Sequence, residues 1–152
     1  MTEQSASTVP SAPDVSTLRI GVLGGTGEQG RGLARRLALA GQSIVVGSRD
    51  AGRAAAAAAE IGSGVVGLGN EECARLSDVV IVAVPWDGHA DLLSTLVEAL
   101  DGKVVVDCVN PLGFDKQGAY ALTVAEGSAA QQAAAILSGS RVVAAFHHIS
   151  AV

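Results

Sequence analysis

Short apolar segments of this chain alternate with segments that have a helical pattern, and this alternation constrains the fold more than any other feature. Segments rich in valine, isoleucine and leucine are expected to be strands: 18–23, 43–49, 64–69, 78–85, 103–109 and 141–146. Alanine-rich or amphipathic segments are expected to be helices: 28–40, 50–61, 70–76, 87–100 and 128–137. Because helices supply the crossovers that parallel strands need, the sequence predicts an α/β fold. This fold is a doubly wound, Rossmann-type parallel sheet of about six strands with helices on both faces.

Several residues are expected to begin or end these helices. Gly41 and Gly62 follow the first two helical segments and are expected to end them. The side chains of Asp50 and Asn70 are expected to cap the second and third helices at their starts. His89, near the start of the fourth helix, is interpreted as a surface residue.

Composition and the chain termini limit the classes of function. Residues 1–17 are rich in Ser, Thr and Pro and are expected to be a disordered tail, followed by one nucleotide-binding domain over residues 18–152. A formal net charge of −5 with scattered basic residues disfavours nucleic acid as a partner. No signal peptide and no run long enough to cross a membrane is visible, so a cytoplasmic location is expected.

The two cysteines are not expected to bind a metal. Cys73 and Cys108 lie far apart in the sequence, without the spacing of a ligand pair, and are interpreted as reduced, buried thiols. The chain also shows no cluster of Cys, Asp or Glu at metal-ligand spacing. The sequence therefore predicts no metal site.

The glycine-rich turn GGTGEQG joins the first predicted strand to the first predicted helix. Gly25, Gly27 and Gly30 fit the pattern G-x-G-x-x-G, which in a strand–turn–helix context binds dinucleotide phosphates. The start of the helix, with Glu28 and Gln29, offers free N–H groups and a positive dipole end to those phosphates. We therefore predict that these five residues bind a dinucleotide.

The same turn also fits a second pattern, because Gly24 completes G-x-x-G-x-x-G, as found in short-chain-type reductases. Those enzymes also need a Tyr-x-x-x-Lys pair. Tyr120 is the only tyrosine of the chain, and no lysine lies four residues after it. The first pattern is therefore preferred.

The end of the second predicted strand indicates which dinucleotide binds. NAD sites usually have an acidic residue there, about 20 residues after the turn, but this chain has Ser48 and Arg49, with Arg53 one helical turn later. A guanidinium binds a phosphate through charge-assisted hydrogen bonds, and the hydroxyl of Thr26 adds a further donor. Asp50 is the competing signal, but as a helix cap it is expected to face outward. The sequence therefore favours NADP.

Five segments together resemble one family, the NADPH-dependent reductases of the deazaflavin coenzyme F420, and among these the actinobacterial members. The segments are GVLGGTGEQGRGLARRLALAG, IVVGSR, VPWDGH, VVVDCVNPL and AAFHHISAV, and the resemblance extends from about Leu18 to Val152. It implies reversible hydride transfer between NADP(H) and F420 as co-substrate. In such proteins the positions that match Thr26, Ser48 and Arg49 serve the 2′-phosphate. The family's nicotinamide contacts match Val84, Pro85 and Trp86, and its deazaflavin pocket matches His147 and Ile149.

The resemblance also limits what is expected of the site. Hydride transfer needs position and shielding from water more than acid–base help, so no essential catalytic residue is predicted. Family members carry a further C-terminal portion that closes the deazaflavin pocket and builds a homodimer, and this portion is expected to be absent here. Two alternatives remain open: an NADP-binding module without catalysis, and a reductase of another acceptor.

Overall fold

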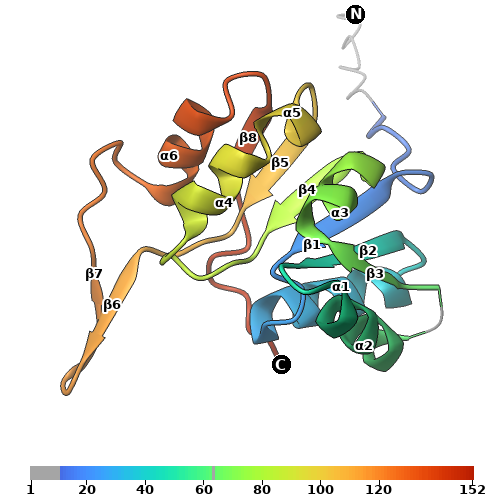
Figure 1. The fold of residues 1–152 in the computed structure, drawn as a ribbon, viewed down its shortest axis with the longest axis horizontal. Coiled ribbons are helices and arrows are strands. Elements are labelled where there is room, and N and C mark those ends of the chain that lie inside the picture. Colours follow the sequence, from blue (N-terminus) through green and yellow to red (C-terminus); the bar gives the residue numbers. More distant parts are fainter. Residues whose placement is uncertain (1–10, 63) are drawn as a thin grey trace, which may run out of the picture.

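The computed structural model describes residues 11–62 and 64–152, so most of the expected tail lies outside the described residues. Six strands form one parallel sheet in the order β3-β2-β1-β4-β5-β8. Their bounds are β1 Arg19–Leu23, β2 Ser43–Ser48, β3 Val66–Gly69, β4 Val79–Val82, β5 Val104–Asp107 and β8 Arg141–Ala144. The predicted fold class, a Rossmann-type parallel sheet, is confirmed (Figure 1).

The strand order places a crevice at the middle of the sheet. From β1 the chain builds β2 and β3 on one side, and then returns to build β4, β5 and β8 on the other side of β1. The register pairs Ile20 with Val79 and Leu23 with Val82. Because ligands of such sheets bind beyond the carboxyl ends of the strands, where the order reverses, the site is expected between β1 and β4.

Helices cover both faces of the sheet, as predicted. Helices α1 (Glu28–Leu39) and α2 (Ala51–Ile61) pack on one face through small residues such as Ala34 and Ala57. On the other face lie α3 (Asn70–Leu76), α4 (His89–Thr95), α5 (Val97–Leu100) and α6 (Ala129–Ile136). The central strands β1 and β4 lie between these layers, and Val22, Val80 and Val82 are fully buried.

The predicted ends of the helices are partly right. Gly41 has a φ of +91° just after α1, and Gly62 is the C-cap of α2. Asp50 caps α2, because its carboxylate accepts a hydrogen bond from the backbone N–H of Arg53 at 3.0 Å. The prediction for Asn70 is wrong: Gly69 holds the N-cap position, and Asn70 is the first residue of α3.

Two further elements differ from the prediction. The helix expected over residues 87–100 is divided into α4 and α5 at Leu96, which has non-helical backbone angles. A hairpin that was not predicted, β6 (Leu112–Asp115) and β7 (Gly118–Ala121), forms a separate two-stranded sheet. Figure 1 shows this hairpin extending away from the domain, and the side chain of Phe114 on it is 76% exposed.

Candidate functional site

The glycine turn after β1 has the close contacts that its pattern predicts. Gly24 has a φ of +75°, which favours glycine, and a Cβ there would lie 2.4 Å from the carbonyl oxygen of Ala83. A Cβ on Gly30 would lie 2.6 Å from the carbonyl oxygen of Gly24. A Cβ on Gly27 would meet the protein only at 3.4 Å, so this glycine leaves space for a ligand at the turn.

The start of helix α1 is open to an anion. Among the described residues no side chain caps it, and its N-cap residue is Gly27. The first N–H groups of a helix have no partner within the helix and, together with the helix dipole, favour negative charge. Such a turn and helix start present unpaired N–H groups of the kind that bind phosphate.

A cavity of about 340 Å³, here called the basic cavity, lies between this turn and the end of β2. Its walls include the predicted residues Thr26, Gly27, Ser48, Arg49 and Arg53. The side chains of Arg49 and Arg53 are exposed, whereas Ser48 is buried and its hydroxyl accepts a hydrogen bond from the backbone N–H of Asp50 at 3.3 Å. Two guanidinium groups beside a helix start suit a ligand with several phosphates.

A second cavity of about 360 Å³, here called the aromatic cavity, lies beyond the ends of β4, β5 and β8. Its walls include Trp86, Phe114 and Phe146, together with the rim residue His147. The two cavities meet at the β4 loop, defined as residues 83–88, because Ala83, Val84, Pro85 and Asp87 line both of them. A long ligand in one cavity would therefore end beside a ligand in the other.

The His147 segment is held in an unusual backbone conformation. Phe146 has a φ of +66°, which is rare for a residue other than glycine. The Nε2 group of Gln29, at the start of α1, donates to the carbonyl oxygen of Phe146 at 3.4 Å. The Nδ2 group of Asn110, after β5, donates to the carbonyl oxygen of His147 at 3.0 Å. The segment is thus bonded to both sides of the crevice.

Of the remaining predicted site residues, only Gln29 lines one of these two cavities. Gly25 and Gly30 are buried and present no side chain to either cavity. Glu28 is exposed and lines a separate cavity along α1, whereas Gln29 belongs to the aromatic cavity. Ile149 is 46% exposed and is not among the residues that line the aromatic cavity.

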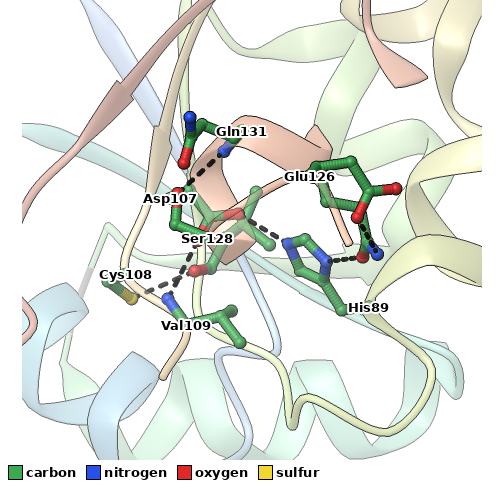
Figure 2. Close-up of polar contacts among 9 residues, drawn as sticks. His89, Asp107, Cys108, Val109, Glu126, Ser128 and Gln131 are labelled. Atoms are coloured by element: carbon green, nitrogen blue, oxygen red, sulfur yellow. Dashed lines mark hydrogen bonds and ion pairs between the residues drawn. The ribbon is translucent and has the colours of Figure 1, made fainter. Parts of the chain in front are cut away.

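His89 is the clearest correction, because it was interpreted as a surface residue and is fully buried. Its Nε2 lies 2.6 Å from Oδ2 of Asp107, which is also fully buried, and its Nδ1 lies 3.1 Å from Oε1 of Gln132. Figure 2 shows the imidazole enclosed between the end of β5 and the segment that contains Glu126 and Ser128. The sequence alone missed this cluster, because Asp107 and Gln132 lie 18 and 43 residues from His89.

The charge on His89 follows from its partners. Burial disfavours the imidazolium, but the hydrogen bonds to Asp107 and Gln132 and the negative charge of Asp107 outweigh it, so the pKa of His89 lies above its ordinary value. Asp107 also accepts a hydrogen bond from the backbone N–H of Val109, at 3.0 Å from its Oδ1. The carboxylate thus has a partner on each oxygen.

The predicted buried thiols are confirmed. Cys73 and Cys108 are both buried and free, and burial raises the pKa of each to about 11. Cys108 lines the aromatic cavity, and its thiol donates to the carbonyl oxygen of Val82 at 3.0 Å. It stays protonated near neutral pH and contributes a small apolar wall rather than a nucleophile.

Neither a group of metal ligands nor a membrane-spanning helix is found in residues 11–62 and 64–152. Within these ranges, no three His, Cys, Asp or Glu side chains are grouped as a metal ion would require. No helix within them is long and apolar enough to cross a membrane.

Asn70 is a candidate site residue that the sequence did not indicate as such. It lines the basic cavity, and its Oδ1 is buried without a hydrogen-bond partner in the described part of the chain. Asn110 and Phe146, in the aromatic cavity, were also not identified. Their position just past β5 and β8 is the one signal that sequence reasoning could have used.

Comparison with known proteins gives consistent matches. A family model described as "NADP oxidoreductase coenzyme F420-dependent" matches residues 19–111. The F420-dependent NADP reductase of Methanothermobacter marburgensis is 41% identical over 145 residues, which are 88% of this chain and 65% of that protein. The protein of the same name from Methanothermobacter thermautotrophicus is 38% identical, over 90% of this chain and 64% of its own length. A solved structure of a hypothetical protein from Sinorhizobium meliloti has a TM-score of 0.73 at 26% identity, and the match covers 89% of this chain and 63% of that one. The chain thus spans slightly less than two thirds of these curated relatives.

Proposed function

Because the chain belongs to the family of coenzyme F420-dependent NADP oxidoreductases, we propose that it is an NADP-dependent oxidoreductase that transfers a hydride reversibly between NADP(H) and F420. One observation carries this proposal beyond the family match. The basic cavity and the aromatic cavity meet at the β4 loop, so a dinucleotide and a flat ring system have adjoining places. In this proposal residues 18–152 form the NADP-binding domain.

The basic cavity supports NADP rather than NAD. The glycine turn and the start of α1 would hold the pyrophosphate, and Thr26, Ser48, Arg49 and Arg53 would hold the 2′-phosphate. A charge-assisted hydrogen bond is worth roughly 1.5–3 kcal/mol, which corresponds to roughly a ten- to 150-fold preference. Asp50 also lines this cavity, but its Oδ1 accepts a hydrogen bond from the backbone N–H of Arg53 as the cap of α2, and two guanidinium groups stand beside it.

The aromatic cavity supports a planar second coenzyme. Val84, Pro85 and Trp86 would contact the nicotinamide, and His147 at the rim would orient the deazaflavin. When bound, the two coenzymes supply the hydride chemistry themselves, and the protein supplies their relative position and excludes water. Ile149, outside the cavity, is proposed only as part of the segment that carries His147.

The test is a hydride-transfer assay of the purified chain with F420, using NADPH or NADH, in the wild type and in Arg49→Glu. We expect the wild type to prefer NADPH by tenfold or more and Arg49→Glu to lose this preference, because a carboxylate repels the 2′-phosphate. Arg141→Glu is the matched control, since this exposed arginine lies at the amino end of β8, away from the site.

Two results would contradict the proposal. An unchanged preference for NADPH in Arg49→Glu would remove Arg49 from the 2′-phosphate site. Binding of NADPH without any hydride transfer to or from F420 would favour a non-catalytic NADP-binding module instead.

For the full-length form of the family, a homodimer accompanies the proposed function, together with a cytoplasmic location. Exposed apolar side chains on the hairpin and on β8 support a protein contact at this end of the domain: Leu112, Phe114, Tyr120 and Val143. The buried free thiols of Cys73 and Cys108 support a reducing compartment.

A further inference from the structure

We propose that Asp107 holds His89 as an imidazolium cation, and that this buried pair positions Trp86 in the wall of the aromatic cavity. The inference rests on the proposed function, since it assigns the pair to the place where the two coenzymes would meet. His89 and Asp107 are fully buried and do not line the cavity, so they are positioning residues rather than catalytic ones.

The hydrogen-bond partners of His89 indicate that both ring nitrogens carry a proton. Nε2 faces a carboxylate oxygen of Asp107, which accepts hydrogen bonds. Nδ1 faces the amide of Gln132, and the other end of this amide donates to the carboxylate of Glu126 at 3.3 Å. Glu126 therefore orients the amide so that its oxygen faces His89. With an acceptor at each nitrogen, the imidazole is a donor on both sides, and only the cation has two N–H groups.

The imidazolium of His89 lies against the indole ring of Trp86. The rings of Trp86 and His89 are stacked, with their centroids 5.5 Å apart and their planes at 28°. A cation over the face of an indole is attracted by the ring quadrupole, more strongly where water is excluded. The protonated form of His89 therefore stabilises the orientation in which Trp86 lines the aromatic cavity.

Asp107 extends this effect to a second wall. Its Oδ1 accepts from the backbone N–H of Val109, so the carboxylate fixes the turn that follows β5. This turn contributes Cys108, Val109 and Asn110 to the aromatic cavity. One carboxylate thus joins the Trp86 wall to the wall after β5, as the contacts in Figure 2 show for Val109 and His89.

The charged groups around His89 determine whether its pKa lies above or below that of a free histidine. Asp107 on β5 contacts it directly, and Glu126 before α6 acts through Gln132, whereas Asp87 and Asp91, next to it in the chain, are exposed. Both carboxylates favour the cation, in agreement with the raised pKa of His89. A free histidine has a pKa of about 6.5 and loses its proton around that pH. His89 should therefore stay protonated in the pH range in which a free histidine becomes neutral.

Trp86 itself provides the measurement, because it is the only tryptophan of the chain. A stacked imidazolium quenches indole fluorescence more than a neutral imidazole does. In the wild type we expect the fluorescence to rise with pH around a midpoint clearly above that of free histidine. The Asp107→Asn variant keeps an oxygen for the N–H of Val109 but presents an amide donor to Nε2, which favours neutral His89. Its midpoint should fall by about one pH unit or more.

Asp115→Asn is the matched control. Asp115 accepts from the backbone N–H two residues later, at 2.7 Å, as Asp107 does, but it lies on the exposed hairpin. This variant should leave the fluorescence midpoint of the wild type unchanged. If Asp107→Asn does not fold, ¹⁵N chemical shifts of the His89 ring in the wild type at pH 7.5 make the same test, and we expect both nitrogens to be protonated.

Steady-state kinetics test the positioning role. We expect Asp107→Asn to raise the KM for F420 by about fivefold or more and to change the dissociation constant of NADPH by less than about twofold, because phosphate contacts dominate NADPH binding. The inference is overturned by a wild-type midpoint near that of free histidine, by a neutral ring in the ¹⁵N spectrum, or by an unchanged KM for F420. A wild type that shows the raised midpoint but transfers no hydride contradicts the proposed function while supporting the imidazolium.

Discussion

At the scale of single residues, the conformation of Phe146 shows how the wall of the aromatic cavity is held. A positive φ on a residue other than glycine costs roughly 1–3 kcal/mol and persists only where neighbouring contacts impose it. Here the amides of Gln29 and Asn110 bond the carbonyl oxygens of Phe146 and His147. The strained turn therefore fixes the direction of His147 from two sides of the crevice.

Replacement of His147 by alanine should affect the second coenzyme selectively. Because His147 lines the aromatic cavity and not the basic one, we expect His147→Ala to raise the apparent KM for F420 by about fivefold or more, or to slow turnover. The dissociation constant of NADPH, measured by fluorescence titration, should change by less than about twofold. His148→Ala, at the exposed neighbour, is the control. Normal kinetics with F420 in His147→Ala would remove this histidine from the site.

The residues of the site differ in how far the sequence revealed them. Arg49 and the glycine turn could be placed in the basic cavity because their spacing relative to strand ends is local and regular. The burial of His89 could not be predicted, because an isolated histidine at a helix start has no local sign of burial. Its burial depends on Asp107 and Gln132, which only the tertiary fold brings to it.

At the scale of elements, the turn and helix α1 form one tightly packed unit. A Cβ on Gly30 would lie 2.6 Å from the carbonyl oxygen of Gly24 and 2.8 Å from the Cα of Gly25, and neither backbone atom can rotate away. The first helical turn therefore sits directly against the loop that would hold the phosphates. Any side chain at Gly30 must displace that loop.

The Gly30→Ala variant should accordingly lose both stability and nucleotide binding. Overpacking of this kind costs about 1–3 kcal/mol, and a displaced turn should weaken NADPH binding by about tenfold or more. Gly69→Ala is the control, since a Cβ there meets nothing within 4 Å. Thermal unfolding and NADPH titration of both variants make the comparison. Equal affinities in the two variants would show that the close contact does not matter for binding.

The hairpin shows what an element needs in order to be predictable. Residues 112–121 were not assigned because both faces of β6 and β7 are largely exposed, so they lack the buried apolar stripe that marks a strand. The four inner strands of the main sheet, β1, β2, β4 and β5, were recognised because their apolar residues are buried between two helical layers. The break at Leu96 was also missed, since leucine at this position fits a continuous helix equally well.

At the scale of the whole molecule, the two cavities depend on parts of the sheet that differ in burial and in position. The basic cavity is built on β1 and β2, which are bonded on both sides and deeply buried. The aromatic cavity also needs the segment after β8, an edge strand with mostly exposed residues. Edge elements with few buried contacts open locally more often than central ones.

Hydrogen exchange should reveal this difference. We expect the amides of residues 141–149 to exchange faster than those of residues 20–23 and 79–82, because opening of an edge strand does not require the core to unfold. Native-state exchange followed by mass spectrometry measures both groups in one sample, and β5 serves as the internal reference. Equal protection across the sheet would mean that the domain opens only as a whole.

The shared β4 loop has a consequence for how the two coenzymes affect each other. Ala83, Val84, Pro85 and Asp87 belong to both cavities, so a molecule that orders this loop from one side changes the loop that the other molecule meets. We therefore expect binding at the two places to be thermodynamically linked. If NADP(H) changes the affinity for F420 by some factor, then F420 must change the affinity for NADP(H) by the same factor.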